Sequence, residues 1–155
     1  MKKTALSLII GFMLSSSIAI GQSIDDELAL YQSIFGVEKK TLVADFISLD
    51  EEKAVIFWDI YYEYEAERKL LGKKRVELLM DYADNYQNID ADKTDELVKA
   101  IMVQRKALDK SVEKYYKQLR KSVGSTEAAQ FYQIEMYILS AIRLSILDAI
   151  PFFGE

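Results

Sequence analysis

Carboxylates carry the clearest chemical potential in this sequence, because it contains no histidine and no cysteine. Glu63, Glu65 and Glu67 alternate along one stretch of the chain. A pair of carboxylates can hydrolyse a glycoside, but the di-iron sites of helical bundles also need a histidine. We interpret the three glutamates as part of a charged helix face. The sequence predicts no catalytic residues, so we expect a protein that is not an enzyme and uses no cofactor.

Asn88, Asp90 and Asp92 have the alternate spacing of the first ligands in an EF-hand calcium loop. Such a loop also needs glycine at its sixth position and glutamate at its twelfth. Lys93 and Lys99 occupy these two positions. The pattern therefore predicts no metal site, and we interpret Asp90 or Asp92 as the N-cap of a helix.

The first residues have the layout of a secretory signal peptide. The basic pair Lys2-Lys3 precedes an apolar run over residues 5–14, and small residues at Ala19 and Gly21 suit a cut before Gln22. The alternative is an uncleaved membrane anchor, but the apolar run is shorter than the roughly 20 residues of a spanning helix. We predict a signal peptide over 1–21 and one helical domain over 22–155.

Export would leave an acidic protein outside the inner membrane. The formal charge of −5 becomes −7 after cleavage, because Lys2 and Lys3 are removed and no acid is. Nucleic-acid binding needs a positive field, so we expect no nucleic-acid partner. We expect no membrane span after cleavage and a periplasmic or secreted location.

Long stretches without helix breakers favour an all-α fold. Pro151 is the only proline after the leader. Apolar residues recur every three or four positions, and Asp50 suits the N-cap before Glu51 and Glu52. The expected helices cover residues 24–47, 51–87, 92–122 and 126–149. Gly124 is expected to end the third helix, and a new side-chain cap in Ser125-Thr126-Glu127 is expected to begin the fourth.

The two central helices should form a long antiparallel hairpin. A helix over 51–87 would be about 55 Å long and must pack along another rod. Arg68 and Arg75 lie on its apolar stripe, where an arginine can extend its head group to a carboxylate. Glu65 is spaced to pair with Lys69. The facing stripe on 92–122 consists of Leu97, Ile101, Gln104, Leu108, Val112, Tyr115 and Leu119.

The last expected helix is apolar on nearly all sides, which is typical of a helix buried in a core or an interface. Glu135, Arg143 and Asp148 argue against a membrane location. We therefore expect a homodimer, formed through this helix or along the hairpin.

Aromatic residues are dense in the hairpin. Neighbours such as Tyr61 and Tyr62 point about 100° apart on a helix, so one can serve the core while the other is partly exposed. One interpretation is ordinary core packing; the other is an adaptable surface for extended or unfolded chains. The residues predicted to contact such clients are Trp58, Tyr62, Tyr86, Tyr116 and Phe153.

The pattern of a signal peptide, a first helix, a long hairpin and a last helix resembles the Spy/CpxP-like superfamily of periplasmic proteins. Its members carry an L-T-x-x-Q motif at helix starts, where this chain has Leu49-Asp50-Glu51-Glu52-Lys53. Three further stretches resemble uncharacterised exported bacterial proteins: 57–64, 81–86 and 128–131. The resemblance implies a curved hairpin, often dimeric, that acts as an ATP-independent chaperone or in an envelope-stress response.

We therefore expect a chaperone-like or envelope-stress-linked protein that binds unfolded or envelope proteins. The alternative is a structural or adaptor protein with one dedicated envelope partner. A third interpretation, a carboxylate-only ion binder or enzyme, follows from the glutamates alone.

Overall fold

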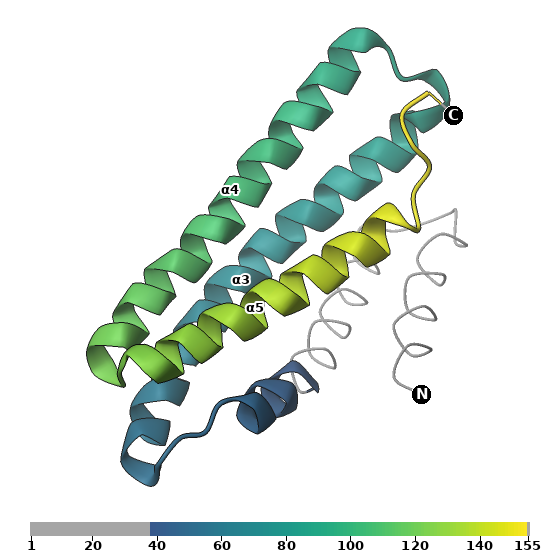
Figure 1. The fold of residues 1–155 in the computed structure, drawn as a ribbon. Helices are drawn as coiled ribbons and strands as arrows, with labels where there is room; N and C mark the ends of the chain where they lie inside the picture. The colour runs from purple at the N-terminus through teal and green to yellow at the C-terminus, as the bar shows by residue number, and fades with distance from the viewer. Residues whose placement is uncertain (1–37, 155) are drawn as a thin grey trace, which may run out of the picture.

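The computed structural model describes residues 38–154, and this part of the chain is all-α (Figure 1). Residues 38–46 are helical and form what we call segment 38–46. The remaining elements are α3 (Glu51–Asn85), the 3-10 turn η1 (Tyr86–Asn88), α4 (Ala91–Ser122) and α5 (Ser125–Leu147). The predicted signal peptide and residues 24–37 of the first predicted helix lie outside the described residues.

α3 and α4 form the predicted long antiparallel hairpin, and α5 runs back beside it (Figure 1). Side-chain caps begin both long helices. Asp50 Oδ1 accepts a hydrogen bond from the Lys53 backbone N–H at 2.8 Å, and Asp90 Oδ1 accepts one from that of Lys93 at 2.8 Å. The caps are therefore at Asp50 and Asp90, while Asp92 lies in the first turn of α4.

Gly124 makes the sharp turn between α4 and α5. Its φ of +116° lies in the left-handed region, which suits a residue without a Cβ atom. We expected a new side-chain cap after this glycine, but Gly124 is itself the N-cap and supplies no side-chain hydrogen bond. The Glu127 carboxylate in the first turn of α5 instead accepts from Lys53 Nζ of α3 at 2.5 Å.

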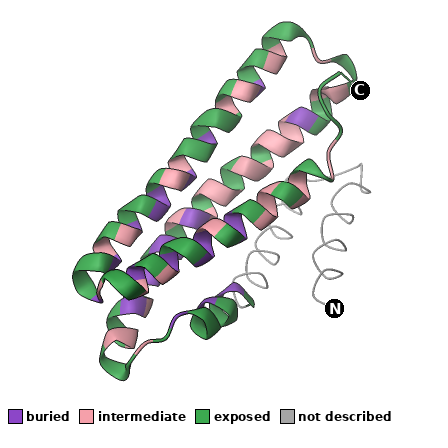
Figure 2. Cartoon of the chain, viewed as in Figure 1, coloured by how far each residue is buried: buried purple, intermediate pink, exposed green. Residues whose placement is uncertain are grey.

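The core is concentrated at the end of the bundle where α4 turns into α5 (Figure 2). Phe131 of α5 is fully buried, and its ring packs against Phe57, Tyr61 and Tyr64 of α3 with centroids 5.1–6.5 Å apart. Segment 38–46 adds Val43 to the same cluster. This end of the molecule thus combines all four helical elements in one core.

The other end of the bundle is less covered. Six members of the stripe predicted on α4 are buried as expected, but Ile101 is 44% exposed. Tyr116 packs against Tyr132 of the antiparallel α5, so Ile101, fifteen residues earlier, is level with Leu147 at the end of α5. Leu97, one turn closer to the start of α4, is nevertheless buried, so the loss of cover is confined to the position of Ile101.

Candidate functional site

A buried charge network joins segment 38–46 to α3 and α5. We define it as Lys39, Tyr64, Glu65, Arg68 and Glu135. Lys39 Nζ donates to Glu65 Oε1 at 2.5 Å and to Glu135 Oε2 at 2.8 Å. The Tyr64 hydroxyl donates to the same Glu135 oxygen at 2.6 Å, and Arg68 donates to both oxygens of Glu65 at 2.7 and 3.0 Å.

The network contains two acidic and two basic groups, so its formal charge is zero. Burial by itself opposes ionisation of Glu65, but the hydrogen bonds from Arg68 and Lys39 lower its pKa overall. Burial likewise opposes the charge of Arg68, yet Glu65 raises its pKa. Burial, together with the charge of Glu135, raises the pKa of Tyr64, so this hydroxyl keeps its proton and acts as a donor. The buried charge network is therefore neutral as a whole.

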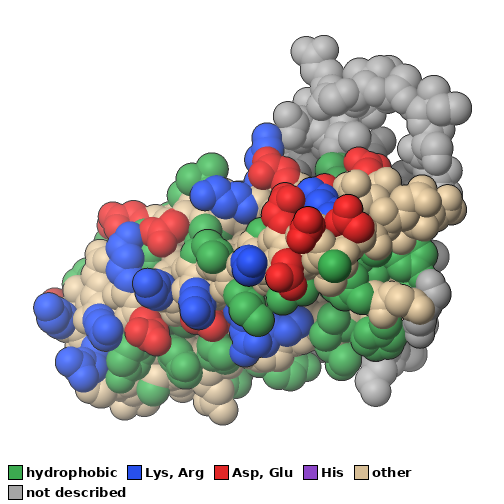
Figure 3. Space-filling view, turned by 90° about the horizontal axis from the view of Figure 1, so that it is seen from above, with side chains coloured by type: hydrophobic (Ala, Val, Ile, Leu, Met, Phe, Trp, Pro, Cys, Tyr) green, Lys and Arg blue, Asp and Glu red, His purple; other side chains and the backbone are tan. Residues whose placement is uncertain are grey.

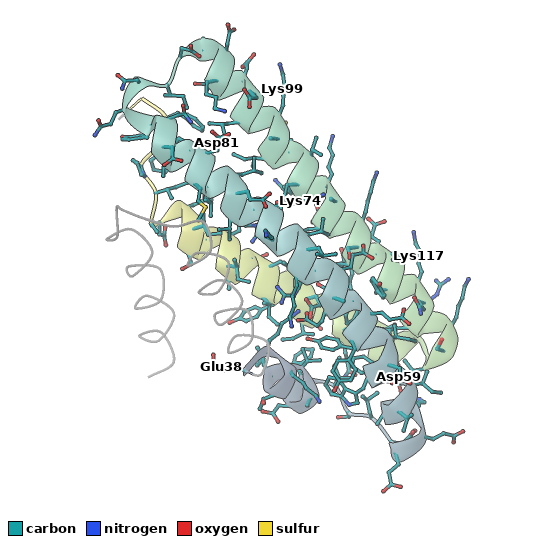
Figure 4. The ribbon with its side chains drawn as sticks, turned by 180° about the vertical axis from the view of Figure 1, so that it is seen from behind. Glu38, Asp59, Lys74, Asp81, Lys99 and Lys117 are labelled. Atoms are coloured by element: carbon teal, nitrogen blue, oxygen red, sulfur yellow. The ribbon has the colours of Figure 1, made fainter. Side chains whose placement is uncertain are left out.

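The hydrogen bonds of Lys39 in the buried charge network hold segment 38–46 on the side of the bundle opposite α4 (Figure 4). The prediction that an arginine of the α3 stripe directs its head group to a carboxylate is confirmed for Arg68, whereas Arg75 forms no ion pair within the described residues. The expected pairing of Glu65 with Lys69 is wrong, because Glu65 points inward and its oxygens accept from Lys39 and Arg68. Charged residues on the outer faces are solvated instead, such as Lys99 and Lys117 in Figure 4.

Trp58 and Tyr62 lie together on α3, beside segment 38–46. Their ring centroids are 6.3 Å apart, and Lys40 Nζ lies 5.1 Å from each ring and donates to the Tyr62 hydroxyl at 2.5 Å. Tyr62 is 50% exposed, whereas its neighbour Tyr61 is buried, so the expected division between adjacent tyrosines is confirmed. Both rings of this pair of client-binding candidates are therefore already in contact with a cation of the same chain, Lys40.

The other three predicted contact residues lie elsewhere. Tyr86 and Phe153 both pack on Tyr82 near the hairpin turn, with centroids 5.6 and 4.9 Å from that ring. Tyr116 packs on Tyr132, between α4 and α5. Trp58 and Tyr82 are 24 residues apart on one helix, which corresponds to about 36 Å. The structure therefore distributes the five candidates over three places.

Sequence reasoning missed the apolar side chains on the outer face of α5. Tyr137 is 68% exposed, Leu144 61% and Leu147 48%. Their spacing of seven and three residues places them on one side of the helix, which we call the α5 outer stripe. Within the described chain only one side of α5 packs against the core, and the expected burial of its other side in a dimer interface stays a prediction. The sequence signal for this stripe was that α5 carries apolar residues on every side, because a helix that packs against the core on one side leaves the others exposed.

Apolar side chains also gather along one edge of the space-filling view, while acidic and basic side chains are dense on the opposite side (Figure 3). Phe152 and Phe153 of the C-terminal tail are both exposed.

The carboxylates considered for metal binding are separated. Glu65 belongs to the buried charge network, and Glu67 accepts from Lys114 Nζ of α4 at 2.6 Å. Glu63 is exposed, and Asp90 caps α4. Within residues 38–154, no three acidic side chains are arranged to hold a metal ion.

Comparison of the chain with protein-family models, with curated proteins and with solved structures finds no match. Among the described helices, none combines the length and the apolar character needed to cross a membrane.

Proposed function

We propose that this protein is an exported, ATP-independent binding protein for unfolded or partly folded chains, and that the α5 outer stripe is its main contact surface. The observation that carries the proposal is the stripe itself, in which large apolar side chains remain exposed on a helix whose other side is fixed in the core. Exposed apolar patches of this kind are typical of protein-binding sites. The signal-peptide layout and the Spy/CpxP-like pattern support the same proposal from the sequence.

The size of the stripe fits weak and reversible binding. Burying Tyr137, Leu144 and Leu147 against a client would contribute about 3–5 kcal/mol before the cost of association. Even without that cost, such an amount corresponds to a Kd of roughly 0.2–6 mM, so the stripe alone supports weak binding. A holdase needs binding of this strength, because it must release its clients without ATP.

Helix α5 is suited to present this surface, because its buried side is anchored. Phe131 and Glu135 hold the first half of α5 against α3 and segment 38–46. The stripe is therefore displayed on a preorganised helix, and binding a client need not order it.

The test is suppression of aggregation. The purified protein at stoichiometric amounts should slow the thermal aggregation of an unrelated enzyme without ATP. Replacing Tyr137 and Leu144 by serine should weaken the interaction by about 10- to 100-fold, since about 2 kcal/mol of apolar burial is lost.

The matched control replaces Val55 and Val103, which are 66% and 68% exposed on α3 and α4, by serine. This variant should protect the client as the wild type does. If several clients aggregate unchanged in the presence of the wild type, the proposal is wrong. A photo-crosslinker at Tyr137 that captures one envelope protein instead of many would favour the adaptor alternative.

A further inference from the structure

The exposed face of α4 carries a row of lysines at helical spacing. The row, which we call the lysine stripe, consists of Lys99, Lys106, Lys110, Lys117 and Lys121. Successive members are seven, four, seven and four residues apart, so all five lie within about 60° of arc on the helix. From its first to its last member, the lysine stripe extends about 33 Å along the helix axis.

The lysine stripe points away from the core. The buried side chains of α4, such as Leu108, Tyr115 and Leu119, lie on the opposite side of the helix. All five lysines are exposed. The side chains of Lys99 and Lys117 are 77% and 66% accessible, and both extend from α4 away from α3 (Figure 4). Within residues 38–154, this face of α4 is therefore open to solvent.

Acidic groups balance the lysine stripe only in part. Lys99 and Lys117 each lie 3.8 Å from a carboxylate one turn earlier on α4, and exposed pairs of this kind are weak. Lys106, Lys110 and Lys121 form no ion pair within the described residues. Between positions 99 and 121 the chain has eight basic and two acidic residues, although its formal net charge is −5. The lysine stripe is a region of positive charge on an acidic protein.

We propose that the lysine stripe docks this protein on an anionic lipid surface. Each lysine held near such a surface strengthens binding about fivefold, and the five act together because one helix holds them in line. Met102 and Val103 lie between Lys99 and Lys106 and are 56% and 68% exposed. Their side chains can enter the boundary between the head groups and the acyl chains. The helix then lies along the membrane surface and does not cross it.

The residue type and the shape of the lysine stripe favour a lipid surface over a folded acidic protein. A lysine ammonium group is a point charge on a flexible stem and needs no fixed partner geometry, whereas arginine matches carboxylates in a rigid bidentate geometry. The stripe lies on the outer side of a helix of 32 residues. An extended flat surface with mobile anionic head groups can contact it along its whole length.

Sedimentation of the whole protein with lipid vesicles tests the proposal. The protein should pellet with vesicles of phosphatidylglycerol and phosphatidylcholine in equal parts, and should remain in the supernatant with phosphatidylcholine alone. Raising the ionic strength from about 0.1 M to about 1 M, which shortens the Debye length from about 10 Å to about 3 Å, should release the protein from the vesicles.

Replacing Lys106 and Lys110 by glutamine removes two adjacent members of the lysine stripe. Binding to the mixed vesicles should weaken about 30-fold, which is about fivefold for each lysine. Glutamine is a good helix former, so circular dichroism should show the helix content of the wild type. This variant should still suppress client aggregation, because the α5 outer stripe is unchanged, so the membrane proposal and the proposed function fail separately.

The matched control replaces Lys73 and Lys74, which are exposed on α3, by glutamine. It removes the same charge from another helix and should retain most of the vesicle binding. An equal loss in the two variants would show that only net charge matters and would overturn the proposal, as would equal sedimentation with both kinds of vesicle. Binding to soluble polyglutamate without binding to vesicles would also overturn it, and would identify an acidic protein partner instead.

Discussion

Lys39 Nζ lies 2.8 Å from Glu135 Oε2, although the two residues are 96 positions apart in the chain. Both side chains are completely removed from solvent. This ion pair joins segment 38–46 to α5, and through Glu65 it joins both to α3. A single lysine thus connects three of the helical elements.

Lys39→Met should destabilise the fold by about 3–5 kcal/mol, because it leaves Glu135 and Glu65 buried with less positive charge. Urea denaturation followed by circular dichroism measures this change. Lys40→Met is the neighbouring control and should cost less than about 1 kcal/mol, because Lys40 is exposed. Equal losses in the two variants would show that the buried charge network does not stabilise the fold.

Stability should fall in acid. The pKa of Glu65 is lower in the folded protein than in an unfolded chain, so its contribution is fully present above the unfolded value of about 4.3 and is lost as the pH falls through the folded value. Urea midpoints measured from pH 7 down to pH 3 test this dependence. In Glu65→Gln the midpoint should be lower at pH 7 and should change less below pH 4.3; an unchanged acid dependence would refute the assignment to Glu65.

Gly124→Ala should destabilise the protein by about 1–2 kcal/mol, because an L-residue with a Cβ atom is strained at a φ of +116°. The added Cβ would also lie 2.8 Å from Glu127 Oε2, so that side chain would have to move away from Lys53. Thermal unfolding provides the measurement. Ser125→Ala, at the next and exposed position, should change stability by less than about 0.5 kcal/mol; a Gly124→Ala protein as stable as this control would contradict the strain argument.

Phe131→Ala should cost about 3–5 kcal/mol, because it leaves a cavity among Phe57, Tyr61 and Tyr64. The adjacent Tyr132→Ala is the control. Tyr132 is partly exposed and packs mainly on Tyr116, so its loss should cost clearly less. Chemical denaturation of the two variants compares them directly, and a Phe131→Ala protein no less stable than Tyr132→Ala would place the core elsewhere.

Much of the candidate surface could not be predicted from the sequence. The five aromatic residues that we selected were chosen by type and local density, and the structure places them in three separate regions. Leu144 escaped selection because an apolar residue on an apolar helix is normally buried. Its exposure follows from the limited width of the surface that α3 and α4 offer to α5.

The sequence by itself determined helices α3, α4 and α5, the cap at Asp50, the turn at Gly124 and the antiparallel hairpin. These features depend on neighbours within three or four positions and on short connections, and such information is local. Only the tertiary structure decided that Lys39 meets Glu135 and that one side of α5 remains exposed. Each of these depends on the register between helices that are distant in the chain, and that register is set by the packing of the whole core.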